Sequence, residues 1–307
     1  MNDADYRVGV LVEHPNMPEW GPGKVIHVHW PKVHVVFRDL PGREAKVIRC
    51  DKVPLKVAAH QTDPILDNLP PLKAEGGKWV LPTKERKTFQ QTLDQFYGYF
   101  PGGFEDKTYL GDLKKGERAY KCRAHDLFVS TLGKGQARAL LASDLPELTR
   151  RTLHVIGKVN LLDPRFESAP FRDGLNEEEV PARRFFEALL NLLDAVSINE
   201  EVFAAYADAC TTLPTKEGGK KRVATWPVVT IVPFLAQPNR HMFLKPSVTH
   251  PAAETLGFDL RYDATPNWRT YEALLKMSAT YLNLLKPKGA RDYIDVQSYF
   301  WVVGGGY

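Results

Sequence analysis

The first sixty residues constrain the fold of this chain most strongly, because apolar and polar positions alternate there in short runs separated by turn-forming residues. Within residues 12–25, Pro15 and Pro18 cannot donate hydrogen bonds to a β ladder and stiffen a turn between two strands. Gly21 and Gly23 follow and permit a sharply bent strand. Further alternating runs lie at residues 24–30, 32–37, 44–49 and 52–57. Five short strands in about sixty residues predict a small closed SH3-like barrel.

The same segment resembles a known family. The resemblance is carried by His14-Pro15, Pro18-Glu19-Trp20-Gly21, Gly23-Lys24-Val25, residues 33–37 and Gly42. These runs resemble a family of short bacterial Tudor/SH3-like barrels of unknown function. That family is similar in outline to the RNA-polymerase-interacting domains of CarD-type regulators and of transcription-repair coupling factors, and to the C-terminal barrels of some repair helicases.

The resemblance covers residues 6–57 and implies a docking module in a nucleic-acid transaction rather than a catalyst. We interpret His14, Trp20 and Trp30 as the residues that dock a partner. Trp20 lies between the proline and glycine breakers, where a large ring can cap the end of a small barrel.

Composition indicates a folded globular protein that does not enter a membrane. Hydrophobic residues make up 43% and aromatic residues 11% of the 307 positions. No apolar run approaches the roughly 20 residues that a membrane helix needs, and the first residues are polar and acidic, unlike a signal peptide. Cys50, Cys122 and Cys210 are isolated thiols without metal-ligand spacing. We therefore expect a cytoplasmic protein without structural zinc.

The segment after the predicted barrel divides the chain. Residues 59–83 contain several prolines and the pair Gly76-Gly77, with little periodicity, which is typical of a linker. Beyond the linker, apolar residues recur at helical spacing over residues 84–100, 117–132, 145–162, 177–196, 202–210 and 266–285, and a final apolar element lies at 292–303. The run at 226–235 fits a buried helix or a short strand equally well. The prediction is an α+β multidomain protein with a barrel at 1–58, a linker at 59–83 and a mainly helical domain at 84–307, which includes one or two short strands at most.

Several basic residues of the helical domain are candidates for nucleic-acid contacts. Gly133-Lys134-Gly135 separates two helical runs and resembles the turn of a helix-hairpin-helix module, whose free backbone N–H groups face a phosphate. An ordinary loop between two helices explains the same glycines. The predicted phosphate contacts are Lys134, Arg138, Lys220, Lys221, Arg222, Arg240 and Lys245. The alternative for each of these residues is a solvated charge on the surface. The net charge of the chain is +4, which by itself only weakly favours a polyanionic partner.

No catalytic motif stands out. His27 and His29 are expected on one face of the barrel with His34 opposite, but they lack a matching carboxylate or thiolate, so we predict neither a metal site nor a cofactor. The chain lacks a Walker-type phosphate loop, an HExxH run and a GxSxG elbow. A nuclease centre at Asp112, Glu117 and Lys121 has suitable residue types, but helical spacing separates their side chains. The sequence does not decide whether the chain is an enzyme, and it favours a protein that is not.

Together these features predict a non-enzymatic accessory protein of a DNA transaction, in transcription regulation, repair or defence against foreign DNA in a bacterium. The predicted partner is nucleic acid, most plainly DNA, with or without a protein such as RNA polymerase or a component of a defence system. Two alternatives stay open: a metal-dependent nuclease whose carboxylates meet only in three dimensions, and an adaptor that binds proteins alone.

Overall fold

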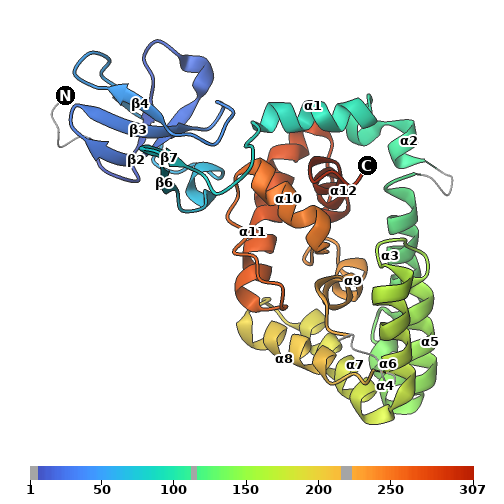
Figure 1. The fold of residues 1–307 in the computed structure, drawn as a ribbon. Helices are drawn as coiled ribbons and strands as arrows, with labels where there is room; N and C mark the ends of the chain where they lie inside the picture. The colour runs from blue at the N-terminus through green and yellow to red at the C-terminus, as the bar shows by residue number, and fades with distance from the viewer. Residues whose placement is uncertain (1–5, 112–115, 216–222) are drawn as a thin grey trace. The chain divides into compact units, whose positions relative to one another are not determined.

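The computed structural model describes residues 6–111, 116–215 and 223–307 and divides the chain into two compact units (Figure 1). The N-terminal unit comprises Met1–Tyr99, His250–Leu260 and Val302–Tyr307. The helical unit comprises Phe100–Thr249 and Arg261–Trp301.

A five-stranded antiparallel sheet, in the order β4-β3-β2-β1-β5, forms the first part of the N-terminal unit. Its strands are β1 (Leu11–Glu13), β2 (Pro22–His29), β3 (Lys32–Phe37), β4 (Lys46–Arg49) and β5 (Lys56–Val57). This confirms the antiparallel strands predicted from the alternating sequence. Within the described residues, the edge strands β4 and β5 each pair with one neighbour, so the sheet is open and a closed barrel is not shown.

The turn rich in proline and glycine joins β1 to β2, as predicted. Pro18–Trp20 forms a short 3-10 helix (η2), and Gly21 follows it with a φ of 65°, a conformation that favours glycine. Gly23 is needed for a different reason. A Cβ at this position would lie 2.5 Å from Cγ1 of Val35 and 2.6 Å from Cδ1 of Phe37. The close approach of β2 to the end of β3 therefore depends on a residue without a side chain.

Both faces of the sheet bury side chains, as the period of two along each strand requires. The first face carries the larger cluster, whose buried members are Tyr6, Val12, Val25, Val33, Val35, Phe37, Ile48, Cys50 and Leu55. The second face carries a smaller cluster of Leu11, Val36, Ala45, Ala58 and Leu66, with Ile26, Leu69, Leu72 and Trp79 packed against it.

Residues 59–83, which we expected to link two domains, supply much of the second cluster. Their elements are η3 (Leu66–Asn68) and a hairpin of β6 (Lys73–Glu75) and β7 (Lys78–Val80). Two backbone hydrogen bonds join the hairpin to the loop before β4. The N–H of Ala45 donates to the carbonyl of Trp79 (2.9 Å), and the N–H of Leu81 donates to that of Arg43 (2.8 Å). The segment thus covers part of the sheet.

Arg86 fastens the chain to the end of β3 from inside the N-terminal unit. Its side chain is buried, and its guanidinium donates to the carbonyls of Phe37 (3.0 Å), Leu40 (3.0 Å) and Arg38 (2.7 Å). A charged residue in a basic run is therefore a core component here, and α1 (Phe89–Tyr99) begins soon after it.

The rest of the chain is helical. Its α-helices are α2 (Lys107–Leu110), α3 (Ala119–Leu132), α4 (Gln136–Ser143), α5 (Leu145–Ile156), α6 (Ala169–Glu177), α7 (Glu179–Asp194), α8 (Glu200–Thr211), α9 (Trp226–Ala236), α10 (Pro246–Leu256), α11 (Trp268–Leu285) and α12 (Tyr293–Val303). Shorter turns are η4 (Gly103–Glu105), η5 (Pro164–Ser168) and η6 (Lys286–Lys288). The predicted mainly helical region is confirmed. Its described residues contain no strand, so the one or two short strands allowed by the sequence are not found there. Among the described residues, the helices lack the length and apolar character that crossing a membrane requires.

Two helices form the centre of the helical unit. Every residue of α9 is buried, which decides the run at 226–235 in favour of a helix. A helix that is apolar on all sides belongs in the core of a larger domain. In α12, Tyr293 to Phe300 are all buried, although this stretch includes the polar residues Asp295, Gln297 and Ser298.

Candidate functional site

The turn between β1 and β2 forms an aromatic rim on the N-terminal unit. The ring of His14 lies 5.0 Å from that of Trp20, which lies 5.1 Å from the ring of buried Phe37. A cavity of about 320 Å³ lies beside this turn, with Glu13, His14, Lys56 and the three turn prolines in its lining. The structure thus brings His14 and Trp20 together next to a concave surface of the size that can hold a partner's side chain.

Trp30 lies elsewhere on the sheet. Trp20 comes just before β2 and Trp30 just after it, so the two rings occupy opposite ends of an eight-residue strand, which spans roughly 25 Å. Trp30 is 42% exposed and stacks on Tyr6 with ring centroids 6.3 Å apart. The three residues predicted to dock a partner therefore do not form one site.

The uncovered part of the second face gathers basic side chains. We call His27, His29, Lys32, His34 and Arg49 the histidine face. Strand register places them together, because His27 pairs with His34, His29 with Lys32, and Lys32 with Arg49, and directly paired residues share a face. This confirms the predicted arrangement of the three histidines.

The histidine face carries aromatic rings as well as charge. The rings of His27 and His34 lie 5.5 Å apart, and the ring of Trp79 lies 5.1 Å from His27. Burial lowers the pKa of His34, and the neighbouring charges of His27, Lys32 and His29 lower it further. Within the described residues, no three His, Cys, Asp or Glu side chains are grouped so that they could hold a metal ion.

Lys134 and Arg138 lie at the connection between α3 and α4. Lys134 is exposed in the tight turn, with a φ of 52°, and Gly135 follows as the residue before α4. Arg138 is engaged within the chain: its Nη2 lies 2.7 Å from an oxygen of Asp194 and donates to Asn191 (2.9 Å). A turn between two helices is present, as both the helix-hairpin-helix interpretation and the ordinary loop require. Of the two basic residues, Lys134 is the one that extends from the turn without a described partner.

Two other predicted phosphate contacts, Arg240 and Lys245, are also paired within the helical unit. The guanidinium of Arg240 donates to the carbonyl of Ala195 (2.6 Å), just beyond the end of α7. Lys245 donates to Glu167 (2.7 Å), and both side chains are largely buried. Lys220, Lys221 and Arg222 lie outside the described residues.

A buried polar cluster joins α12 to residues before and within α3, and sequence reasoning missed it. Asp295 is fully buried and accepts from the hydroxyl of Tyr109 (2.5 Å), and it lies 2.8 Å from Nη1 of Arg118. Arg118 also donates to both carboxylate oxygens of Asp292 (2.8 and 2.6 Å). Burial raises the pKa of Asp295, and Arg118 opposes that shift. The signal for α12 in the sequence was three polar residues, Asp295, Gln297 and Ser298, within an apolar run.

Lys121 belongs to the same cluster and bears on the nuclease alternative. Its side chain is fully buried, its Nζ donates to Glu117 and to the hydroxyl of Ser298 (3.0 Å), and burial lowers its pKa. Glu117 precedes α3, so it reaches Lys121 from one turn away, while Asp112 lies outside the described residues. In the cluster as described, carboxylates that could bind a metal ion are instead paired with Lys121 and Arg118.

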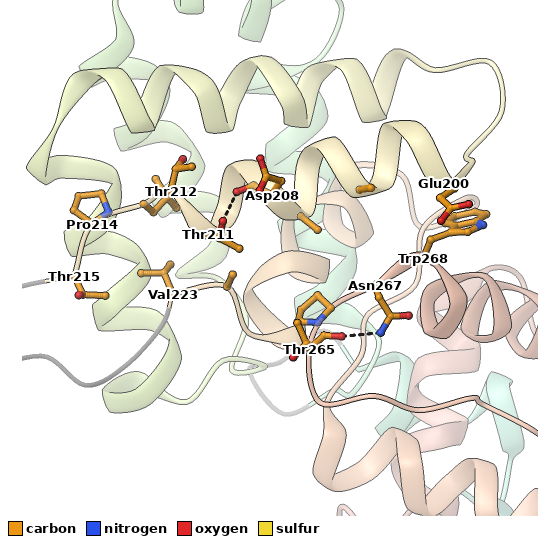
Figure 2. Close-up of a pocket in the computed structure, with 15 residues that line it drawn as sticks. Glu200, Asp208, Thr211, Thr212, Pro214, Thr215, Val223, Thr265, Asn267 and Trp268 are labelled. Atoms are coloured by element: carbon orange, nitrogen blue, oxygen red, sulfur yellow. Dashed lines mark hydrogen bonds between the residues drawn. The ribbon is translucent and has the colours of Figure 1, made fainter.

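A pocket of about 890 Å³ lies in the helical unit between α8, the segments that follow it and the start of α11 (Figure 2). Glu200 and Trp268 lie at one end and Pro214 at the other. Asn267 donates to the carbonyl of Thr265 (2.8 Å), and the described lining contains no histidine, cysteine or lysine. Apolar walls with hydroxyl groups are suited to binding a ligand or a side chain.

Comparison with known proteins gives one match. Residues 7–58 match a family model described as a protein of unknown function (DUF3553). No curated protein matches the chain, and no solved structure does. The matched residues include the aromatic rim and all five residues of the histidine face, whereas Trp79 lies outside the match, so the chain is similar to this family over its sheet.

Proposed function

We propose that this protein is a non-enzymatic accessory of a DNA transaction, in transcription regulation, repair or defence, and that its sheet docks the partner. One observation carries the proposal. Residues 7–58 contain nine Lys or Arg and five Asp or Glu, so their excess of four positive charges equals the net charge of the whole chain. The rest of the chain is balanced. Electrostatic attraction to a polyanion is therefore concentrated on the segment that carries the family match.

In this proposal the sheet is a Tudor/SH3-like barrel, similar in outline to the polymerase-docking domains named above. Lys134, in the exposed turn between α3 and α4, adds a phosphate contact from the helical unit. Arg138, Arg240 and Lys245 already have partners within the chain and would have to exchange them for phosphate, which favours Lys134 and the sheet as the principal contacts.

Binding of labelled duplex DNA, single-stranded DNA and RNA to the full chain tests the proposal by fluorescence anisotropy. We expect binding that weakens linearly in a log–log plot against salt, with a slope of about 0.9 per phosphate contact for duplex DNA and about 0.7 for single strands. The same mixtures, incubated with Mg²⁺ or Mn²⁺, should leave every strand intact. Cleavage that disappears in Glu117→Gln would establish the nuclease instead.

The aromatic rim favours a second candidate, an adaptor for proteins. His14 lines its cavity, and the ring of Trp20 lies against that of His14. A small concave surface with an aromatic edge is typical of side-chain recognition. Pull-down from a bacterial lysate with wild type and Trp20→Ala, combined with thermal melting, tests it. Loss of a specific partner without loss of stability supports the adaptor, whereas lower stability with every partner retained shows that Trp20 only completes the core.

A further inference from the structure

We propose that the histidine face is a binding site for single-stranded DNA, in which Lys32 and Arg49 contact phosphates and the rings of His27 and Trp79 support the bases. This inference rests on the proposed function and names the surface and the form of nucleic acid that the function uses. It assigns the contact to residues other than His14, Trp20 and Trp30.

Basic side chains come from every strand that forms this face. β2 contributes His27 and His29, β3 contributes Lys32 and His34, and β4 contributes Arg49. The carboxylate recorded beside them is Asp51, which pairs with the exposed Arg49 (2.7 Å). An exposed ion pair of this kind contributes only about 0.2–1 kcal/mol, so a phosphate can replace Asp51 as the partner of Arg49 at small cost.

The hairpin that borders the face does not cancel this charge. Its Lys78 pairs with Glu44 (2.9 Å), and its Glu75 pairs with Arg43, so each acidic side chain is matched by a basic one. What the hairpin adds is the ring of Trp79 against His27. Val47, directly opposite His34 and 48% exposed, extends the apolar part of the surface.

The shape of the surface favours a single strand over a duplex. β2, β3 and β4 present a shallow three-stranded surface, which is one strand wider than the two-stranded ribbon that the major groove of DNA admits. Unpaired bases can instead lie on such a sheet face, where aromatic and histidine rings stack on them while basic residues follow the backbone.

The histidines make the binding depend on pH. The pKa of His34 is lowered by burial and then by His27, Lys32 and His29, so it is held neutral partly by like charges around it. Phosphates bound nearby offset that repulsion and raise the pKa of His34, so binding takes up protons. Affinity should therefore increase as the pH falls from 8 to 6.

The experiment measures anisotropy of a labelled oligothymidylate of fifteen nucleotides on the full chain. The test variant is Lys32→Gln with Arg49→Gln. The control is Lys46→Gln with Lys52→Gln, which removes the same charge from the same segment. Lys46 pairs with Val35 and so belongs to the other face of the sheet, and all four side chains are exposed. Lys32→Gln alone serves as a second test variant.

We expect the test variant to bind on the order of tenfold more weakly at low salt, with a log–log salt slope smaller by about 1.4 for two lost contacts. The control should change affinity less than threefold. His27→Gln with His34→Gln should remove most of the gain in affinity between pH 8 and 6.

Each other result decides between the two proposals. If wild type binds no nucleic acid, the nucleic-acid part of the proposed function fails and this inference fails with it. If wild type binds DNA but the test variant and the control lose equal affinity, only the histidine face is refuted. Tighter binding of a duplex or of oligouridylate than of oligothymidylate would reject single-stranded DNA as the occupant.

Discussion

Replacing Arg86 with methionine should loosen the N-terminal unit at the end of β3. Arg86 is 2% exposed, and its guanidinium donates to three carbonyls, those of Phe37, Arg38 and Leu40, at 2.7–3.0 Å. Its stem also lies close to Gly257, where a Cβ would approach Cδ of Arg86 to 2.9 Å. Methionine keeps much of the apolar stem but donates no hydrogen bond.

The expected loss of stability follows from these contacts. A buried carbonyl that loses its donor costs about 1–3 kcal/mol, and three are affected. Removing a buried cation returns part of that cost, because the charge no longer has to be desolvated. We therefore expect the unfolding free energy of the N-terminal unit to fall by about 3–5 kcal/mol. Arg86→Lys should lower the unfolding free energy by less than Arg86→Met, because its ammonium group can still donate hydrogen bonds. Some loss should remain, because an ammonium group cannot match the planar fork of the guanidinium.

Hydrogen exchange measured by mass spectrometry on the full chain reports this unit separately from the other. Peptides that cover residues 33–42 should exchange faster in Arg86→Met, while peptides from α7 and α9 keep the wild-type rate. Lys84→Met is the matched control, because Lys84 is exposed and belongs to the same basic run. Equal exchange in the two variants would refute the structural role assigned to Arg86.

Three further predictions concern the rest of the fold. Gly23→Ala should destabilise the sheet by about 1–3 kcal/mol in thermal melts, because its Cβ would overlap the side chains of Val35 and Phe37 on β3. As the control, Gly98→Ala, in an exposed turn of α1, should stabilise the protein by about 0.5–1 kcal/mol. Lys121→Met should lower the unfolding free energy of the helical unit, measured in urea, by about 3 kcal/mol, because it leaves the carboxylate of Glu117 without its partner. Adding Glu117→Gln should recover part of that loss. A double variant no more stable than Lys121→Met would contradict the pairing. Burial lowers the pKa of His241 to about 3 from 6.5, so the folded state keeps it neutral while the unfolded chain binds a proton. The free energy of unfolding should therefore decrease as the pH falls from 6.5 to about 3. The decrease should be steeper in wild type than in His241→Gln, by up to about 1.4 kcal/mol per pH unit.

Local patterns were sufficient for the strands and for most helices. Alternation in β2 and β3 predicted which histidines share a face, and the turn residues around Trp20 predicted where the chain reverses. Closure of a barrel was not predictable from the same signals, because it depends on whether the two edge strands meet, and they lie at the ends of the sheet order. The run at 226–235 gave no periodicity because every side of α9 is buried.

Proline misled the sequence interpretation at two helices. The helices predicted from the sequence leave out residues 165–175 and 246–256, yet these two segments form most of α6 and all of α10. Pro170 and Pro246 lie in the first turns of their helices, where a missing N–H costs nothing. Pro251 lies inside α10, where tertiary packing overrides a local preference against helix.

Side-chain partners distant in sequence were beyond prediction. Arg138 pairs with Asp194, 56 positions away, and Lys245 with Glu167, 78 positions away, so neither could be distinguished from a solvated charge. The same limit hid the contact between Tyr109 and Asp295, which are 186 positions apart. Which basic residues of the helical unit are paired within the chain therefore emerged only from the fold.

The buried cluster around Asp295 argues against assigning catalysis to Glu117 and Lys121. A metal-dependent nuclease needs carboxylates that are free to bind the ion, and a general base needs a proton acceptor within reach of substrate. Here Lys121 is fully buried against Glu117 and Ser298, and Asp295 is shared between Tyr109 and Arg118. Buried ions contribute little net stability unless every partner is present, but removing one partner is costly. The cluster is thus best understood as a set of mutually dependent contacts that fixes α12 against α3, and Glu117→Gln should change stability rather than any cleavage of nucleic acid.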